Sequence, residues 1–309
     1  GEKTVTLHMG GGLTSSSPQY DQWVAFADAV KERSNGTLNI SLDLSGALGS
    51  DREVIEGVMN GSIEMMHMAD GSIATVITET GYVALPFLFP TREAAEEYYF
   101  NGELGRIYKE ILAENNITVL GNLIEGDPRW ISNSIREITK PEDLAGLKIR
   151  VMESPVYITS FTLLGANPTP ISFSELFTAL QNKTVDGQDN DPSLTYTCKF
   201  YEVQPYYTDL EHVLTVTNMY MSEDWYNDLS DEYKTIIDEA CKRFSDYCTE
   251  ARIQSYEDNL QLLADEGVEV TRLTAENRKL FQEAVEPMYD EYIERWGQDI
   301  FDAARAYNN

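Results

Sequence analysis

Histidine, cysteine and basic residues are scarce in this chain, and each scarcity argues against a class of function. The 309 residues include three histidines and three cysteines, and 23 basic residues stand against 52 acidic ones, for a formal net charge of −29. Nucleic acids and anionic lipid surfaces bind dense positive patches, so neither is expected as a partner. A small anion is still compatible with this charge, because salt screens the global field over roughly 8 Å and one or two arginines can dominate a closed cleft.

Long apolar segments are missing as well. No apolar run approaches the roughly 20 residues that a helix needs to cross a bilayer. The longest candidate, residues 82–89, is interrupted by Pro86. We therefore expect no membrane insertion. No signal peptide precedes Gly1, and for an exported protein we expect that segment to have been removed.

The few cysteines form no evident disulfide or metal site. They are Cys198, Cys241 and Cys248. Their odd number prevents complete internal pairing. Cys241 and Cys248 fall in a strongly helical stretch, about 10 Å apart along the axis, which is too far for a disulfide within one straight helix. We expect buried free thiols, and no cysteine–histidine spacing predicts a metal site.

Catalytic and cofactor motifs are also lacking. Gly10-Gly11-Gly12 follows a predicted strand but lacks the lysine of a phosphate loop and the spacing of a dinucleotide fingerprint. The run from Asp186 to Asp191 lacks the glycine and glutamate positions of an EF-hand. No Gly-x-Ser-x-Gly elbow is present. We expect no cofactor, no metal and no enzymatic activity, with an enzyme acting on a carboxylate substrate as the alternative of another class.

The first two thirds of the chain alternate short apolar strands with amphipathic helices. The strands are expected over residues 4–9, 38–42, 63–68 and 117–123. A helix capped by Ser17 lies between the first two, and a helix over 51–59 precedes the third. Such strand–helix–strand units predict a parallel sheet covered by helices.

A second block of the same kind begins near Trp130, and the end of the chain is helical. The second block contains a strand over 147–151, a helix capped at Ser154 and a helix starting at a capping box of Ser172 and Glu175. Residues 230–266 and 274–296 are expected to be helices. This pattern predicts an α/β protein of two domains or lobes between which the chain crosses more than once.

Two arginines occupy positions where an α/β protein binds ligands. Arg150 ends the strand over 147–151, and Arg129 lies between Pro128 and Trp130 at the start of the second block. A residue at the carboxyl end of such a strand faces the crevice where ligands bind. A guanidinium group binds a carboxylate through two parallel hydrogen bonds, which lysine cannot do. The alternative for each arginine is a structural ion pair.

Several motifs together resemble the solute-binding subunit of TRAP (tripartite ATP-independent periplasmic) transporters, the DctP family. They are Gly146-Leu-Lys-Ile-Arg-Val-Met-Glu-Ser-Pro155, Leu164-Gly-Ala-Asn-Pro-Thr-Pro170, Ser174-Glu-Leu-Phe-Thr-Ala-Leu-Gln181 and Val185-Asp-Gly-Gln-Asp-Asn190. Leu48-Gly-Ser-Asp-Arg52, Asn60-Gly-Ser-Ile63 and Phe200-Tyr-Glu-Val-Gln204 with His212 extend the resemblance over the whole chain.

This resemblance implies a two-lobed, periplasmic-binding-protein-like α/β fold that closes over one ligand. Each lobe is then a helix-flanked mixed sheet, joined to the other by hinge strands and a long helix that spans both lobes. We expect the N-terminal lobe to comprise residues 1–125 and about 215–250. The C-terminal lobe is expected to comprise residues 126–214 and 251–309.

The resemblance also implies the carboxylate site. Arg150 matches the arginine that grips the ligand carboxylate, and Arg129 matches a second arginine that is frequent among carboxylate binders of the family. Asn190 matches an asparagine that hydrogen-bonds the same carboxylate, although Asp189 stands where glutamate is usual and Asp191 is inserted before the proline. Phe173 falls where members place a ring against the ligand, and packing in the core is its alternative.

The remaining pocket residues are inferred less directly. Glu153 occupies a loop position that commonly lines the site in the family. Asp51 begins a helix and Asp70 follows a strand, so both are candidates to face the cleft from the first lobe, with helix and turn roles as alternatives. Trp130 is a candidate to stack on a ligand ring or simply to pack. Acids in the pocket suit hydroxyl donors, which favours a sugar acid such as a uronate.

Together these observations predict an extracytoplasmic solute-binding protein that delivers a small organic carboxylate to TRAP membrane subunits. A C4-dicarboxylate, a 2-keto acid and an aromatic acid remain alternative ligands. A membrane receptor that senses the bound ligand is the alternative partner. We expect a periplasmic or otherwise extracytoplasmic location, with a lipid anchor at the removed N-terminus as one option, and a monomer.

Overall fold

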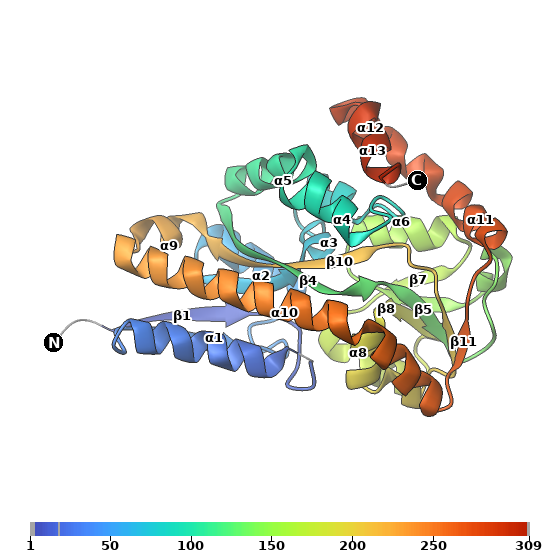
Figure 1. Ribbon diagram of the computed structural model, residues 1–309, viewed down its shortest axis with the longest axis horizontal. Helices are drawn as coiled ribbons and strands as arrows, with labels where there is room; N and C mark the ends of the chain where they lie inside the picture. The colour runs from blue at the N-terminus through green and yellow to red at the C-terminus, as the bar shows by residue number, and fades with distance from the viewer. Residues whose placement is uncertain (1–3, 18, 308–309) are drawn as a thin grey trace.

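The computed structural model describes residues 4–17 and 19–307, apart from the side chains of 122–126. Two mixed sheets lie side by side along the long axis of the molecule (Figure 1). We call the five-stranded sheet with helices α1, α2, α3 and α5 the first half. The six-stranded sheet with helices α6, α7 and α8 is the second half. This arrangement confirms the two-lobed α/β fold.

The sheet of the first half has the strand order β2-β1-β3-β10-β4. Its strands are β1 (Val5–Gly10), β2 (Leu38–Asp43), β3 (Met65–Ala69), β4 (Ile117–Pro128) and β10 (Leu214–Ser222). β1, β2 and β3 are parallel, and β10 is antiparallel to both β3 and β4. The helices of this half are α1 (Tyr20–Arg33), α2 (Asp51–Asn60), α3 (Asp70–Ile73) and α5 (Glu103–Glu114).

Alternation along the strands divides the core of the first half into two clusters. Met65 packs with α1 and with α10 (Asp231–Asp265), whereas its neighbour Met66 packs with α2 and α5. Successive side chains of a strand point to opposite faces, so one apolar run covers both sides of the sheet. Such continuous burial is typical of a sheet with helices on both faces.

The sheet of the second half has the strand order β11-β9-β5-β8-β6-β7. Its strands are β5 (Trp130–Asn133), β6 (Lys148–Val151), β7 (Asn167–Pro170), β8 (Gly187–Asn190), β9 (Tyr206–Thr208) and β11 (Glu269–Thr271). Its helices are α6 (Pro155–Leu163), α7 (Leu176–Gln181) and α8 (Pro192–Thr197). β5 is antiparallel to its neighbours β8 and β9, while β6 is parallel to β7 and β8.

The chain crosses between the two sheets at three places. β4 ends at Pro128 and β5 begins at Trp130, so Arg129 alone forms the first crossing. Residues 209–213 lead back from β9 to β10. The long helix α10 then runs from the sheet of the first half, past α8, to β11 (Figure 1). When only a few segments connect two halves, the halves can move as rigid bodies about a hinge.

The C-terminal helices lie over both halves. They are α11 (Ala275–Val285), α12 (Asp290–Trp296) and α13 (Gln298–Arg305). α11 contacts α6, whereas Trp296 and Phe301 pack against Tyr82 of the first half. The boundaries at residues 125, 215 and 250 stay a prediction.

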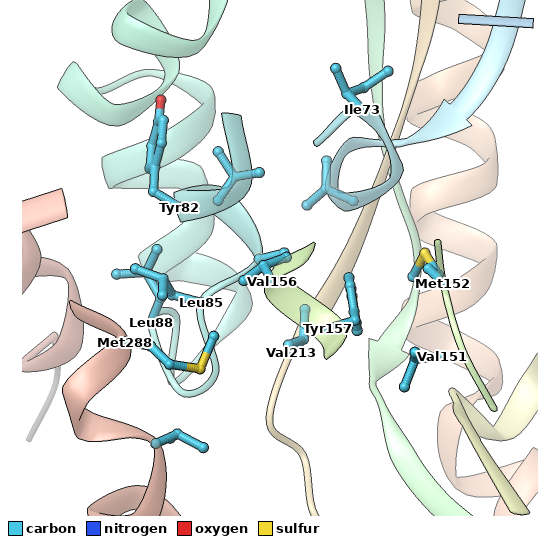
Figure 2. Close-up of a cluster of buried hydrophobic side chains, with 14 of the residues drawn as sticks. Ile73, Tyr82, Leu85, Leu88, Val151, Met152, Val156, Tyr157, Val213 and Met288 are labelled. Atoms are coloured by element: carbon cyan, nitrogen blue, oxygen red, sulfur yellow. The ribbon is translucent and has the colours of Figure 1, made fainter. Parts of the chain in front are cut away.

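One hydrophobic cluster joins the two halves. It includes Ile73 and Tyr82 from the first half and Val156 and Tyr157 from α6 (Figure 2). Because these side chains are buried together, the halves are in contact rather than separated by solvent. This contact fixes how closely the facing loops approach each other over the cavity described below.

The shorter segments are 3₁₀ turns, one π-helical turn and short α-helices. The 3₁₀ turns are Thr78–Ala84, Pro141–Leu144, Phe173–Glu175, Phe200–Glu202 and Glu286–Tyr289. The π-helical turn is Glu96–Phe100, and the short helices are α4 (Arg92–Ala95) and α9 (Glu223–Asp228).

Four predicted helix signals are wrong in detail. α1 begins at Tyr20, and Ser17 instead accepts a hydrogen bond from the Thr14 amide. Ser154 and Ser172 make no side-chain cap, so the predicted box with Glu175 is absent. A helix was expected over 274–296, but a 3₁₀ turn interrupts it at 286–289, where a proline removes a backbone donor. Pro18 lies outside the described residues.

Candidate functional site

A cavity lies between the two halves, at the ends of strands from both sheets. From the first half it is lined by the loop after β1, the start of α2, the end of β3, α3 and β10. From the second half it is lined by the ends of β6 and β8, the turn at Phe173 and the start of α8. Its volume is about 60 Å³.

Five of the eight predicted site residues line this cavity. They are Asp51, Arg129, Arg150, Phe173 and Asn190. They come from a helix start, a crossing between halves, two strand ends and a turn, which are far apart in sequence. The structure therefore brings these five residues together around one cavity, and their contact with a ligand stays a prediction.

Arg150 is a buried cation that pairs with no carboxylate of the side chains described by the structure. Its side chain is 2% exposed. Nε donates to the Ile171 carbonyl at 2.8 Å, and the guanidinium carbon lies 6.0 Å from the centre of the Phe173 ring. Among the side chains that the structure describes, no salt bridge reaches Arg150. The terminal nitrogens of this guanidinium are therefore left for a partner in the cavity.

The electrostatics of Arg150 reflect this lack of a partner. Burial lowers its pKa to about 10, and the positive charge of Arg129 adds to that effect. Asp189, Asp51 and Glu153 act in the opposite direction without cancelling it. A buried charge without a matched partner is costly, so an anion entering the cavity relieves an existing penalty.

Arg129 is paired within the protein. Its Nε donates to Asp189 Oδ2 at 2.6 Å, its Nη2 donates to the Asp189 carbonyl, and its Nη1 donates to Thr215 at 3.2 Å. His212 Nε2 lies 3.2 Å from the same carboxylate oxygen. Burial opposes ionisation of Asp189, but Arg129 and His212 hold its pKa well below the usual range. Asp189 in turn raises the pKa of Arg129 against the effect of burial.

Asn190 is held at the end of β8 by a chain of buried hydrogen bonds. Its Nδ2 donates to Gln188 at 2.7 Å, Gln188 donates to Ser132 at 2.8 Å, and Ser132 donates to Gln204 at 2.8 Å. The Asn190 carbonyl accepts from the Tyr207 hydroxyl at 2.8 Å. A satisfied network of this kind fixes the side chain before any ligand binds.

Two acids act electrostatically on Arg150, and only Asp51 lines the cavity. Asp51 is the first residue of α2, after the capping box of Ser50 and Glu53. Burial raises the pKa of Asp51, Arg150 lowers it, and Glu153 raises it further. Glu153 does not line the cavity, although its Oε2 is buried without a hydrogen-bond partner in the described part of the chain.

Asp70 and Trp130 do not line the cavity, which corrects their predicted contact with the ligand. Asp70 begins α3 and accepts the Gly71 amide, and burial raises its pKa to about 8. Trp130 packs on Tyr207, with ring centres 4.9 Å apart, and donates to the Tyr256 hydroxyl at 3.2 Å. Both side chains are buried against other parts of the protein.

Sequence reasoning missed several residues of the cavity wall. They include Gly12, His67, Ser72, Met152, Thr215 and Thr217. Ser72 and Met152 meet across the two halves, with 3.1 Å between the hydroxyl oxygen and the sulfur. No motif marks these residues, since small polar and apolar side chains are common in any core. The one available signal was position, because His67 lies near the end of β3 and Thr215 and Thr217 lie in β10.

Two further observations concern metals and membranes. Within residues 4–17 and 19–307 no group of three or more histidine, cysteine or acidic side chains is arranged to bind a metal ion. No helix in this part of the chain is long and apolar enough to cross a bilayer. Cys241 and Cys248 are buried and Cys198 is half-buried.

Comparison with known proteins identifies the family. Residues 9–295 match the family model of bacterial extracellular solute-binding proteins, family 7. The chain therefore belongs to this family of solute-binding proteins, as the motifs indicated, and is not an enzyme.

Three similar proteins illustrate the range of the family. A sialic acid-binding periplasmic protein of Vibrio cholerae is 31% identical, over 96% of this chain and 91% of the other. The sugar acid binding protein of Advenella mimigardefordensis, solved with galactonate, is 35% identical with a TM-score of 0.88, covering 98% and 97%. A TRAP periplasmic solute-binding protein of Sulfurospirillum deleyianum, solved with succinate, is 26% identical with a TM-score of 0.88, covering 98% and 99%.

The pairing difference between the two arginines gives a first prediction. In ligand-free protein we expect Arg150→Met to leave the free energy of unfolding unchanged or to raise it, because it removes an unpaired buried cation. Arg129→Met, the matched control, should cost about 3–5 kcal/mol, because it leaves Asp189 buried without its partner. Urea unfolding at pH 7 measures both.

The lowered pKa of Arg150 fixes the sign with which folding stability depends on pH. The pKa of Arg150 is lowered in the folded state, so charging it penalises folding at all pH values below about 10. The penalty disappears as the pH rises from about 10 towards the pKa of arginine in the unfolded chain. The difference in free energy of unfolding between Arg150→Met and the wild type should therefore shrink in this pH range. A loss of stability in Arg150→Met equal to that in Arg129→Met would contradict this account.

Proposed function

We propose that this protein captures a small hydroxylated monocarboxylate of the sugar-acid type. The observation that carries the proposal is the unpaired, buried guanidinium of Arg150 in a cavity between two halves. A carboxylate supplies two acceptor oxygens that match the guanidinium fork. Asn190 and Arg129 lie in the same wall to complete that contact.

The charges around Arg150 support one carboxylate rather than two. Arg129 is neutralised by Asp189, which leaves Arg150 as the cation available to a ligand. Asp51 contributes negative charge from the first half and Glu153 from the second. A second carboxylate would be repelled by these charges, whereas hydroxyl groups would donate to the Asp51 carboxylate in the cavity wall. The similar proteins solved with galactonate and succinate are consistent with carboxylate ligands of both kinds.

Binding is proposed to act by closure of the two lobes, 1–125 with about 215–250 and 126–214 with 251–309. The ligand contacts both halves only when they approach, so it stabilises the closed state by its differential affinity. Delivery to the membrane subunits of a TRAP transporter then follows from family membership, and we expect a monomer that acts outside the cytoplasm, with a lipid anchor as one option.

Ligand class is testable by a screen. We expect D-galactonate and D-glucuronate to raise the melting temperature of the wild type, and succinate to do so less, because of the charge on Asp51. Asp51→Asn should reduce the difference between the rise in melting temperature caused by the sugar acids and that caused by succinate. Differential scanning fluorimetry followed by calorimetry measures these effects. Stabilisation by succinate but by no sugar acid would select the C4-dicarboxylate alternative and refute the proposal.

Closure itself is testable at Gly71. A β-carbon on Gly71 of α3 would lie 2.8 Å from the Tyr157 ring of α6 and 3.0 Å from the Ala84 side chain. We expect Gly71→Val to hold the halves apart and to weaken sugar-acid affinity roughly 10-fold, since overpacking costs about 1–3 kcal/mol. Small-angle scattering should then show less compaction on ligand addition than in the wild type.

A second substitution at this contact should compensate for the clash that Gly71→Val creates. Tyr157→Leu in the Gly71→Val background removes the ring that the new methyl groups meet and should restore part of the affinity. Wild-type affinity in Gly71→Val alone would show that the approach of α3 and α6 does not accompany binding.

A further inference from the structure

Asp70 is a buried acid next to the cavity wall whose charge has no counter-ion. It begins α3, is 4% exposed and does not line the cavity. Its Oδ1 accepts the Gly71 amide at 2.6 Å, and the Tyr99 hydroxyl hydrogen-bonds the same carboxyl group. Among the side chains that the structure describes, no salt bridge reaches Asp70. An unpaired carboxyl group in such a place avoids the cost of a buried charge by keeping its proton.

Aromatic hydroxyl groups, rather than cations, surround Asp70. The Tyr108 hydroxyl donates to the Asp70 carbonyl at 3.4 Å and pairs with the Tyr220 hydroxyl at 2.8 Å. Five tyrosines interact electrostatically with Asp70, from the turn at 78–84, the π-helical turn, α5, α6 and β10. They are Tyr82, Tyr99, Tyr108, Tyr157 and Tyr220. Burial raises the pKa of each, so all five stay neutral when the solution is mildly alkaline.

Asp70 is therefore the group of this cluster that changes charge just above neutral pH. Burial raises its pKa to about 8, and the charge of Arg129 lowers the pKa only slightly in return. His67 of β3 is neutral there, because burial lowers its pKa to about 3. Asp51 at the start of α2 hydrogen-bonds Ser72 of α3, and burial raises its pKa as well. Its titration has to be separated from that of Asp70 by a control.

α3 connects Asp70 to the contact between the two halves. Gly71 lies so close to α6 that an added β-carbon would be 2.8 Å from the Tyr157 ring. The Ser72 hydroxyl lines the cavity, 3.1 Å from the Met152 sulfur of the second half. Because the Asp70 carboxyl group holds the Gly71 amide, it fixes the direction in which these two residues meet the second half.

We propose that Asp70 is a positioning residue whose neutral carboxyl group holds α3 against the second half, so that loss of its proton weakens ligand binding. The inference rests on the proposed function and deepens it, because it adds control of the same site by pH. An ionised carboxylate in this place must draw in water or move away, and either response displaces Gly71 and Ser72. By linkage, ligand binding then favours the protonated form and takes up protons near the pH at which Asp70 ionises.

The test compares the wild type with Asp70→Asn, which keeps one acceptor and one donor but cannot ionise. Calorimetry measures D-galactonate affinity at about pH 6.5 and about pH 9. We expect the wild type to bind up to roughly 10-fold more weakly at the higher pH, and Asp70→Asn to keep its affinity. The two proteins should bind alike at the lower pH. Asp51→Asn is the matched control and should retain the pH dependence of the wild type, whatever its affinity.

A proton count distinguishes this role from a merely structural one. Calorimetry at about pH 8.5 in two buffers of different ionisation enthalpy measures the protons taken up when D-galactonate binds. The wild type should take up protons, and Asp70→Asn should take up none. The same pH dependence and the same proton uptake in both proteins would overturn the inference.

The proton on Asp70 is also testable without a ligand. The folded-state pKa lies above the ordinary value of 3.8, so the stability that Asp70 contributes at low pH is lost as the pH rises from about 3.8 to about 8. In urea unfolding, Asp70→Asn should gain stability relative to the wild type across this range, and the difference should be constant above it. A difference that does not change with pH would show that Asp70 is ionised in the folded protein, and the inference would fall.

Failure of the underlying proposal gives another pattern. If the wild type binds succinate but not D-galactonate, the sugar-acid proposal is refuted, and the same pH comparison with succinate decides the role of Asp70. If D-galactonate binds and the wild type and Asp70→Asn share one pH profile, only the Asp70 inference is refuted.

Discussion

A guanidinium group without a counter-ion, buried between two halves of a protein, is the constraint on which this site depends. Arg150 carries a charge that the fold neither exposes to water nor neutralises, whereas Arg129, which lines the same cavity, is fully neutralised by Asp189. This contrast distinguishes Arg129, which forms a structural ion pair, from Arg150, which we propose binds the ligand. It also gives closure its driving force, because an anion that enters replaces the hydration that Arg150 loses when the halves meet.

The first half completes the site with polar groups of a different character. Asp51 stands at the start of α2 and lines the cavity. An acid suits hydroxyl groups better than a second carboxylate. The two halves would thus divide recognition, with charge on one side and hydroxyl hydrogen bonds on the other.

Sequence reasoning predicted the features that depend on local rules. Strand–helix alternation indicated two α/β blocks, and the position of Arg150 at a strand end placed it at the crevice before any contact was known. The family motifs indicated Asn190 in the same way. Placement at the cavity could be predicted because a strand end has a fixed direction relative to its sheet.

The sequence alone could not predict whether a residue faces the cavity or the core where tertiary packing decides this. Arg129 and Trp130 are neighbours, yet the arginine faces the cavity and the tryptophan packs on Tyr207, because successive side chains near a strand point to opposite faces. Asp70 turns into the core at the start of α3. His67 carries no motif, and a lone histidine in an apolar strand is usually a packed core residue.

The most direct test is mass spectrometry of the small molecules released when purified wild-type protein and Arg150→Met are unfolded. The account predicts that the wild type releases a hydroxylated monocarboxylic acid and that the variant releases none. Release of the same compound in equal amount from both proteins, or of a compound without a carboxylate, would contradict it.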